Sequence, residues 1–135
     1  MPTLRTRRNS GFTLIELMVV MTIIVTLAAI GVAVYGNSVK RAKEATLKED
    51  LFRMRDAIDQ YYADKGKYPP SLDALVEDRY MRSVPVDPFT NSSDSWQTVP
   101  AESDPANPSA EPGIYDVRSG SDETALDGTK YSDWK

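Results

Sequence analysis

Two successive patterns of apolar residues run through the first half of the chain. The first is an uncharged stretch, residues 17–34, with the sequence LMVVMTIIVTLAAIGVAV. Extended by a few residues on each side, it is long enough to cross the ~30 Å hydrocarbon core of a membrane as a helix, so we predict a membrane-spanning segment over residues 12–36. A cleaved secretory signal peptide is the alternative, because Leu27-Ala28-Ala29 offers small residues near the end of the stretch. A carboxylate at Glu16, inside the apolar stretch, argues against that alternative.

The second pattern is amphipathic and keeps the helical period. Apolar residues recur at alternating spacings of four and three, and the other face is charged. The stripe comprises Leu47, Leu51, Met54, Ile58 and Tyr61, and Phe52 and Tyr62 are expected to widen it. No proline lies between residues 12 and 63, so one helix of ~50 residues is expected. We interpret the stripe as a face that packs on the chain's own sheet, because the alternative, a coiled-coil seam, needs more heptads.

Turn-forming residues end this helix and divide the rest of the chain. Lys65 and Gly66 supply a C-terminal cation and a left-handed cap, and the prolines that follow Tyr68 cannot continue the helix. Ser71 is placed to cap a short second helix that contains Leu75. We predict strands at residues 96–99 and 114–117, a proline-rich loop at 100–112 and a polar tail at 119–135. The predicted fold class is therefore α+β, with a long N-terminal helix packed on a small antiparallel sheet and one globular domain over residues 37–135.

Composition and charge narrow the classes of function. Arg5, Arg7 and Arg8 lie in a segment without acidic residues, which by the positive-inside rule keeps the N-terminus in the cytoplasm and places the domain outside it. The whole chain has a formal charge of −4, so nucleic acid is not an expected partner. The chain has no cysteine and no histidine, which removes disulfides, the commonest zinc ligand and the usual general base. We predict that the protein is not an enzyme.

A short motif carries the functional prediction. Residues 11–20 read GFTLIELMVV directly after the basic segment. This resembles the processing motif of type IV pilin-like prepilins. The resemblance implies that a prepilin peptidase removes the leader, residues 1–11, by cutting between Gly11 and Phe12, and that the new amine of Phe12 is then methylated. It also implies that Glu16 pairs with the amine of Phe12 on a neighbouring subunit during assembly, which offsets the cost of a carboxylate in lipid. The alternative is an interfacial Glu16 within reach of Arg7 or Arg8.

The downstream sequence is similar to the major pseudopilin of the type II secretion system. The similar features are the tyrosine-rich end of the long helix, the Asp87-Pro88-Phe89-Thr90-Asn91 turn and the acidic tail. The resemblance implies a calcium site in that tail, with Asp122 and Asp127 as ligands, the carbonyl of Ser119 as a backbone donor, and Asp133 as a further candidate. Val25 and Ala33 occupy positions where the family often has glycine and proline, so local helix unwinding is not indicated.

These features predict a structural subunit of a type II secretion pseudopilus. The resemblance implies a single-pass inner-membrane precursor that joins a periplasmic or extracellular filament. Its expected partners are further copies of the chain, other pseudopilins, the prepilin peptidase and methyltransferase, and an inner-membrane assembly platform with its ATPase. A type IV pilin for adhesion, motility or DNA uptake is the alternative, although such pilins often carry a C-terminal disulfide. A membrane-tethered binding module that never polymerises is a third possibility.

Overall fold

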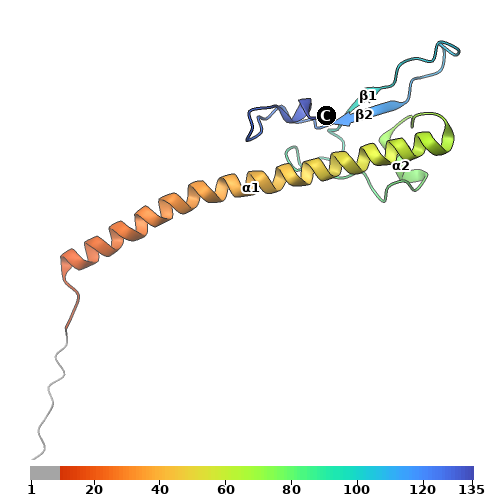
Figure 1. Ribbon diagram of the computed structural model, residues 1–135. Helices are drawn as coiled ribbons and strands as arrows, with labels where there is room; N and C mark the ends of the chain where they lie inside the picture. The colour runs from red at the N-terminus through yellow and green to blue at the C-terminus, as the bar shows by residue number, and fades with distance from the viewer. Residues whose placement is uncertain (1–9) are drawn as a thin grey trace, which may run out of the picture. The chain divides into compact units, whose positions relative to one another are not determined.

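The computed structural model of the protein describes residues 10–135, and the elements follow one another as in Figure 1. They are α1 (Leu14–Lys65), α2 (Leu72–Glu77), β1 (Gln97–Pro100), β2 (Ile114–Arg118) and the short 3-10 helix η1 (Tyr131–Asp133). The chain divides after Ser38 into two compact units, which we describe separately. The arginines of the predicted leader lie outside the described residues.

The first unit consists of the N-terminal half of α1. Its large apolar side chains are exposed, from Phe12 to Tyr35, and the helix is long and apolar enough to cross a membrane. The hydroxyl groups of Thr22 and Thr26 donate to the carbonyl oxygens of Met18 and Thr22, each at 2.8 Å. These polar side chains are therefore satisfied within the helix itself, which suits a helix surrounded by lipid.

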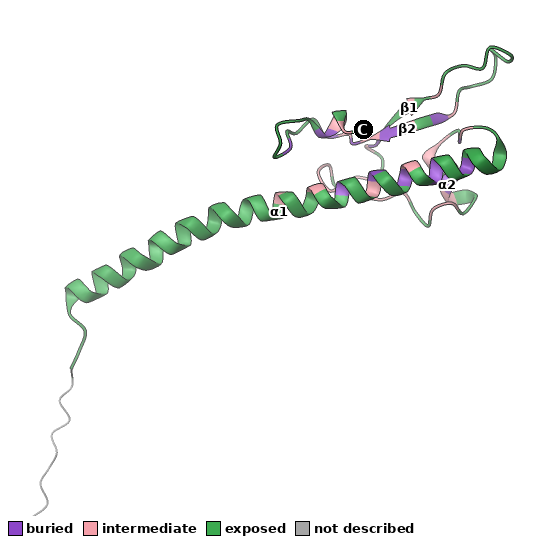
Figure 2. Cartoon of the chain, viewed as in Figure 1, coloured by how far each residue is buried: buried purple, intermediate pink, exposed green. Residues whose placement is uncertain are grey.

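The second unit contains the amphipathic half of α1, on which a stripe of residues is buried (Figure 2). The buried residues are Leu47, Leu51, Met54, Ala57, Ile58 and Tyr61, which confirms the predicted core face. Phe52 and Tyr62 do not widen this stripe, because 67 % and 46 % of their surfaces are exposed. Each follows a buried residue by one position, and one position turns the side chain about 100° around the helix, away from the sheet.

The end of α1 forms as the sequence predicts. Gly66 adopts a left-handed conformation, with φ of +68°, and its N–H donates to the carbonyl oxygen of Tyr62 at 2.8 Å. The hydroxyl oxygen of Ser71 accepts from the backbone N–H of Ala74 at 3.2 Å and so caps α2. Leu75 of α2 is fully buried and joins the core beside α1.

Strands β1 and β2 form a two-stranded antiparallel sheet. Gln97 pairs with Arg118 and Thr98 with Val117, and the register shifts between Val99 and Pro100. The shift falls at a proline, which has no N–H to offer the ladder. Both predicted strands are confirmed, and they lie within one residue of the expected bounds at each end.

The core consists of two clusters along the buried stripe of α1. One joins Leu47, Leu51 and Met54 to Trp96, Val117, Ala125 and Tyr131. The other joins Ala57, Ile58 and Tyr61 to Leu75 and Ile114. Helix, sheet and tail thus share one core, which confirms the α+β class with a long helix packed on a small antiparallel sheet.

Candidate functional site: the processing end, the C-terminal tail and a basic groove

The predicted cleavage point lies just before α1. Gly11 and Phe12 are exposed and precede the first helical residue, Leu14. No atom lies within 4 Å of the position that a Cβ on Gly11 would take, and 87 % of the Phe12 surface is exposed. The peptide bond between them therefore lies outside the helix and is accessible to a peptidase.

Glu16 lies in the first turn of α1. Its backbone N–H donates to the hydroxyl oxygen of Thr13 at 3.2 Å, so Thr13 caps the helix. A carboxylate at this position interacts favourably with the positive end of the helix dipole. The spacing Thr13-Leu14-Ile15-Glu16 is that of a capping box, a signal that the sequence analysis missed. The helix therefore starts directly after the predicted cleavage point, with Glu16 on its first turn.

The start of the tail is fixed by a buried carboxylate. Asp87 and Ser119 are both fully buried, and the Ser119 hydroxyl donates to the Asp87 carboxylate. The same carboxylate accepts from the backbone N–H of Phe89 at 2.8 Å. A Cβ on Gly120 would collide with the carbonyl of Ser95, so only glycine fits where the tail crosses that segment. The turn at Asp87 is one of the features in which the sequence is similar to the major pseudopilin. In the structure this turn holds the start of the tail in place.

Two polar residues of α1 hold the middle of the tail. The Lys40 ammonium donates to the carbonyl oxygen of Thr124 at 2.6 Å. The Glu44 carboxylate accepts from the backbone N–H of Leu126 and from the Tyr131 hydroxyl, each at 2.8 Å. Burial, together with the hydrogen bond to Glu44, raises the pKa of Tyr131. No local sequence pattern predicts these contacts, because their partners lie more than eighty positions apart.

The predicted calcium ligands make hydrogen bonds of their own. One oxygen of Asp127 accepts from the backbone N–H of Thr129 at 3.0 Å and from its hydroxyl at 2.6 Å, and these bonds lower the pKa of Asp127. Asp122 accepts from Ser132 at 3.3 Å, and Asp133 belongs to η1. Among residues 10–135, no group of three or more acidic side chains is placed to hold a metal ion. These hydrogen bonds add to those from Lys40 and Glu44, and calcium binding by the tail stays a prediction.

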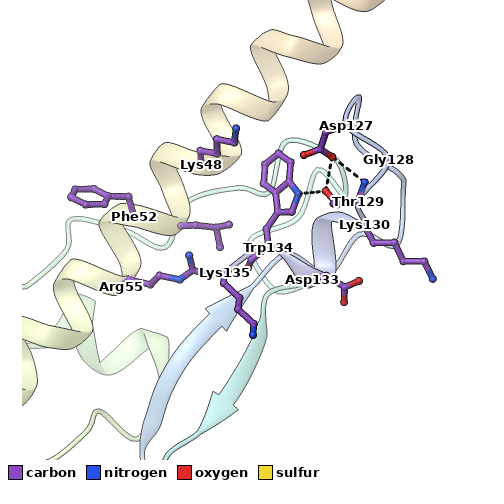
Figure 3. A pocket seen from close by; sticks show the side chains of 11 residues that line it. Lys48, Phe52, Arg55, Asp127, Gly128, Thr129, Lys130, Asp133, Trp134 and Lys135 are labelled. Carbon is purple, nitrogen blue, oxygen red and sulfur yellow. Dashed lines mark hydrogen bonds between the residues drawn. The ribbon is translucent and has the colours of Figure 1, made fainter.

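A groove of about 760 Å³ runs between α1 and the tail (Figure 3). We call it the basic groove. Its cationic lining residues are Lys48, Arg55, Lys130 and Lys135, its acidic ones are Asp127 and Asp133, and its aromatic ones are Phe52 and Trp134. Arg55 forms an ion pair with Asp116 at 2.7 Å. Cations therefore outnumber carboxylates in the lining by four to two. The Lys48 ammonium lies 5.0 Å from the centre of the Trp134 ring, and the Trp134 indole N–H donates to the Thr129 hydroxyl at 2.8 Å. Trp134 is therefore held rigidly as one wall.

Comparison with known proteins identifies the family. Residues 6–32 match the model of the prokaryotic N-terminal methylation motif. The type II secretion system core protein G of Pseudomonas aeruginosa is 37 % identical over 101 residues, which span 63 % of this chain and 71 % of that protein. The chain belongs to the type II secretion system core protein G family. The corresponding protein of Aeromonas hydrophila is 33 % identical over the same shares of the two chains, 63 % and 71 %.

Other comparisons define the limits of this assignment. The fimbrial protein EcpC of Eikenella corrodens is 38 % identical over 83 residues, 58 % of this chain and 54 % of that protein. No solved structure shows a significant match. The match to the methylation motif covers Gly11, Phe12 and Glu16, so this chain is a pilin-like major pseudopilin, as its sequence indicated. The apolar helix and the prepilin motif fit a single-pass inner-membrane protein of the secretion system. The roles of the individual site residues stay predictions.

Proposed function

We propose that this chain is a structural subunit that polymerises into the periplasmic pseudopilus of a type II secretion system and helps to drive protein export. The observation that carries the proposal is the N-terminal half of α1, whose apolar side chains are exposed along its whole length. A membrane covers such a helix before assembly, and neighbouring copies cover it afterwards. Repetition of one such contact between copies produces an open-ended helical filament.

Processing prepares the chain for this step. A prepilin peptidase cuts between Gly11 and Phe12, and methylation follows on the Phe12 amine. The leader arginines keep the N-terminus cytoplasmic and the domain periplasmic until then. Glu16 then pairs with the amine of Phe12 on the neighbouring subunit, because a carboxylate left alone among apolar helices costs several kcal/mol. The mature protein should begin at Phe12 with one added methyl group, and mass spectrometry of the N-terminal peptide measures both changes. A chain that still starts at Met1 contradicts the processing step.

The partners follow from this role. They are further copies of the chain, other pseudopilins, the peptidase and methyltransferase, and an inner-membrane assembly platform. The sequence has no phosphate-binding loop with which to bind a nucleotide itself. We therefore assign the supply of energy to an ATPase on the cytoplasmic side. The chain itself contributes surface and shape to the filament, and we assign it no catalytic step.

The experiment is electron microscopy of cells that overproduce the chain together with its assembly machinery. We expect filaments that contain this chain, and none from cells that lack the peptidase. If the processed chain remains in the membrane and forms no filament, it is a tethered binding module instead.

A type IV pilin is the second candidate, favoured by the similarity to the fimbrial protein of Eikenella corrodens. The same cells distinguish the two roles. A pseudopilus subunit restores secretion to a strain that lacks its own copy, whereas a pilin restores surface filaments and motility without restoring secretion.

Calcium binding by the tail is part of the proposal that only the resemblance supports. Asp122 and Asp127 are exposed and hold oxygen atoms of the kind that calcium takes. The carbonyl of Ser119 supplies a backbone oxygen and Asp133 is a further candidate ligand. Calcium would then act on the stability of the tail, through binding energy that becomes folding energy.

A further inference from the structure

The basic groove combines lysines with aromatic side chains, which suits a ligand that is both anionic and apolar. Lys48, Lys130 and Lys135 line it, and within residues 10–135 none of these three ammonium groups forms an ion pair. Phe52 lies on the helix side of the groove and is 67 % exposed, whereas its neighbour Leu51 is buried. Trp134 faces the groove from the tail side. An aromatic-lined groove with cations at its rim is the kind of surface that binds extended, proline-rich segments with acidic side chains.

The chain contains such a segment in the loop between β1 and β2. Residues 101–112 read AESDPANPSAEP, with Glu102, Asp104 and Glu111 and without any lysine or arginine. Nearly all of the loop is exposed. Its base is closed by the N–H of Ala101, which donates to the carbonyl oxygen of Gly113 at 2.7 Å. Proline restricts the backbone of the loop, so little conformational freedom is lost when it binds.

Local hydrogen bonds shape the tip of this loop. Asp104 accepts from the backbone N–H of Ala106 at 2.8 Å through its side chain and from Asn107 at 3.0 Å through its carbonyl oxygen. The N–H of Ala110 donates to the carbonyl oxygen of Asn107 at 3.1 Å. The two turns present Glu102 and Glu111 on an ordered, apolar proline and alanine backbone.

We propose that the acidic proline-rich loop, residues 101–112, of one copy docks in the basic groove of a second copy. The acids of the loop lie against the lysines of the groove, and its prolines lie on Phe52 and Trp134. This inference rests on the proposed function, since it describes a contact between filament subunits. The inference assigns a role to the loop. Strands β1 and β2, which the loop connects, do not need so long a connection in order to pair.

The loop and the groove lie at different places along α1. The groove lies beside Lys48, Phe52 and Arg55, whereas the loop lies beside the end of the helix, where Glu102 and Glu111 share a cavity with Tyr62 and Gly66. About ten helical residues separate the two places, which is ~15 Å along the axis. A loop and a groove on different patches give a head-to-tail contact, and such a contact builds an open-ended series when the rotation between copies does not close a ring.

The absence of cysteine from the sequence allows a direct test in assembled filaments. Lys48→Cys places a thiol at the groove and Ser103→Cys places one on the loop, and both positions are exposed. We expect the double variant, oxidised as filaments, to give a ladder of disulfide-linked multimers on a non-reducing gel. A mixture of the two single variants should stop at the dimer. The matched control pairs Ser103→Cys with Glu77→Cys, an exposed position on α2 away from the groove, and should give no ladder.

A charge exchange tests the chemistry of the contact. Lys48→Glu combined with Lys130→Glu should reduce filament yield, and so should Glu102→Lys combined with Glu111→Lys. The two reversed sets should restore yield when they are combined in one chain, which a fault in folding cannot explain. If unmodified chains form no filaments, the proposed function fails. If filaments form normally but the double cysteine variant gives only monomers, or links to another pseudopilin, the docking inference is wrong and the proposed function stands.

Discussion

The large apolar side chains of α1 lie exposed in its first half, whereas in its second half a stripe of them is buried against the chain's own strands and tail (Figure 2). Ile23 is 53 % exposed and Leu47 is 0 % exposed, although both belong to one continuous helix. Backbone hydrogen bonding is the same in both halves, so it cannot explain the difference. What differs is the partner. The second half packs on other parts of the same chain, and under the proposed function lipid or other subunits cover the first half.

This contrast explains how one helix serves two purposes. The second half is stabilised by burial of apolar area within the domain, which fixes the fold of a single copy. The first half gains nothing from the domain and is left available for assembly. Substitutions in the two halves should therefore affect different properties: assembly for the first half and stability of the domain for the second.

Replacement of Glu16 should break assembly without breaking the domain. Removing one partner of a buried charge pair costs about 3–5 kcal/mol, so Glu16→Leu should lower filament yield below detection by electron microscopy. Membrane insertion should persist, because a polar cost is removed. Thr22→Leu is the control, since the Thr22 hydroxyl bonds only within its own helix, and it should assemble normally. Abundant filaments from Glu16→Leu would show that the charge pair is dispensable.

Replacement of Leu51 should break the domain instead. Leu51 is 2 % exposed and belongs to the main core cluster. In a soluble fragment of residues 37–135, Leu51→Ala should lower the free energy of unfolding by about 2–4 kcal/mol, measured by urea denaturation. Leu126→Ala is the matched control, because Leu126 is 42 % exposed, and it should cost less than about 1 kcal/mol. A similar small cost at Leu51 would mean that this residue serves contacts between subunits.

Tyr131 should make the domain sensitive to alkali. Burial and the bond to Glu44 raise the pKa of Tyr131, so the folded state keeps its proton above pH ~10, where the unfolded chain loses it. The resulting stability is present below pH ~10 and is lost as pH rises beyond that value. Tyr131→Phe should flatten the fall of the melting temperature at alkaline pH. Tyr115→Phe, at a position 58 % exposed, should leave that fall unchanged. An unaltered slope in Tyr131→Phe rules out this residue as its source.

Calcium should have the smallest effect on the domain. Lys40 and Glu44 already hold the tail on α1, so the ion has less disorder to remove. We expect calcium, but not magnesium, to raise the melting temperature of the soluble fragment. The corresponding gain in free energy of unfolding should be less than the ~2.7 kcal/mol that a ligand at 100 times its dissociation constant supplies to a fully coupled site. Asp122→Ala should abolish the rise. Identical melts with calcium, magnesium and chelator would leave the tail as a structure held by protein groups alone.

Local signals in the sequence predicted most of the fold. The spacing of Leu47, Leu51 and Met54 defined the buried face, because apolar periodicity depends only on the geometry of the helix. Gly66 and Ser71 marked where one helix ends and the next begins, because caps are made by neighbours in the chain. Phe52 was misassigned to the core, since a stripe drawn from spacing alone has no sharp edge.

The candidate site was less predictable. Gly11, Phe12 and Glu16 were readable because they form one short segment, and the family match to residues 6–32 covers that segment. The tail residues Asp122, Asp127 and Asp133 were named as calcium ligands from the resemblance, and among residues 10–135 no group of three or more acidic side chains is placed to hold a metal ion. Proximity along a loop does not bring side chains together, because the direction of each is set by backbone turns that the sequence does not reveal.

The sequence by itself determined the helix, its apolar half, the processing motif and the two strands, because each depends on residues within a few positions of one another. Only the tertiary structure decided how the tail is held and where the basic groove lies. Lys40 and Glu44 reach Thr124 and Leu126 across more than eighty positions, and Asp87 meets Ser119 across thirty-two. Such pairs form only after the core brings α1, the sheet and the tail together, so no local sequence pattern predicts them.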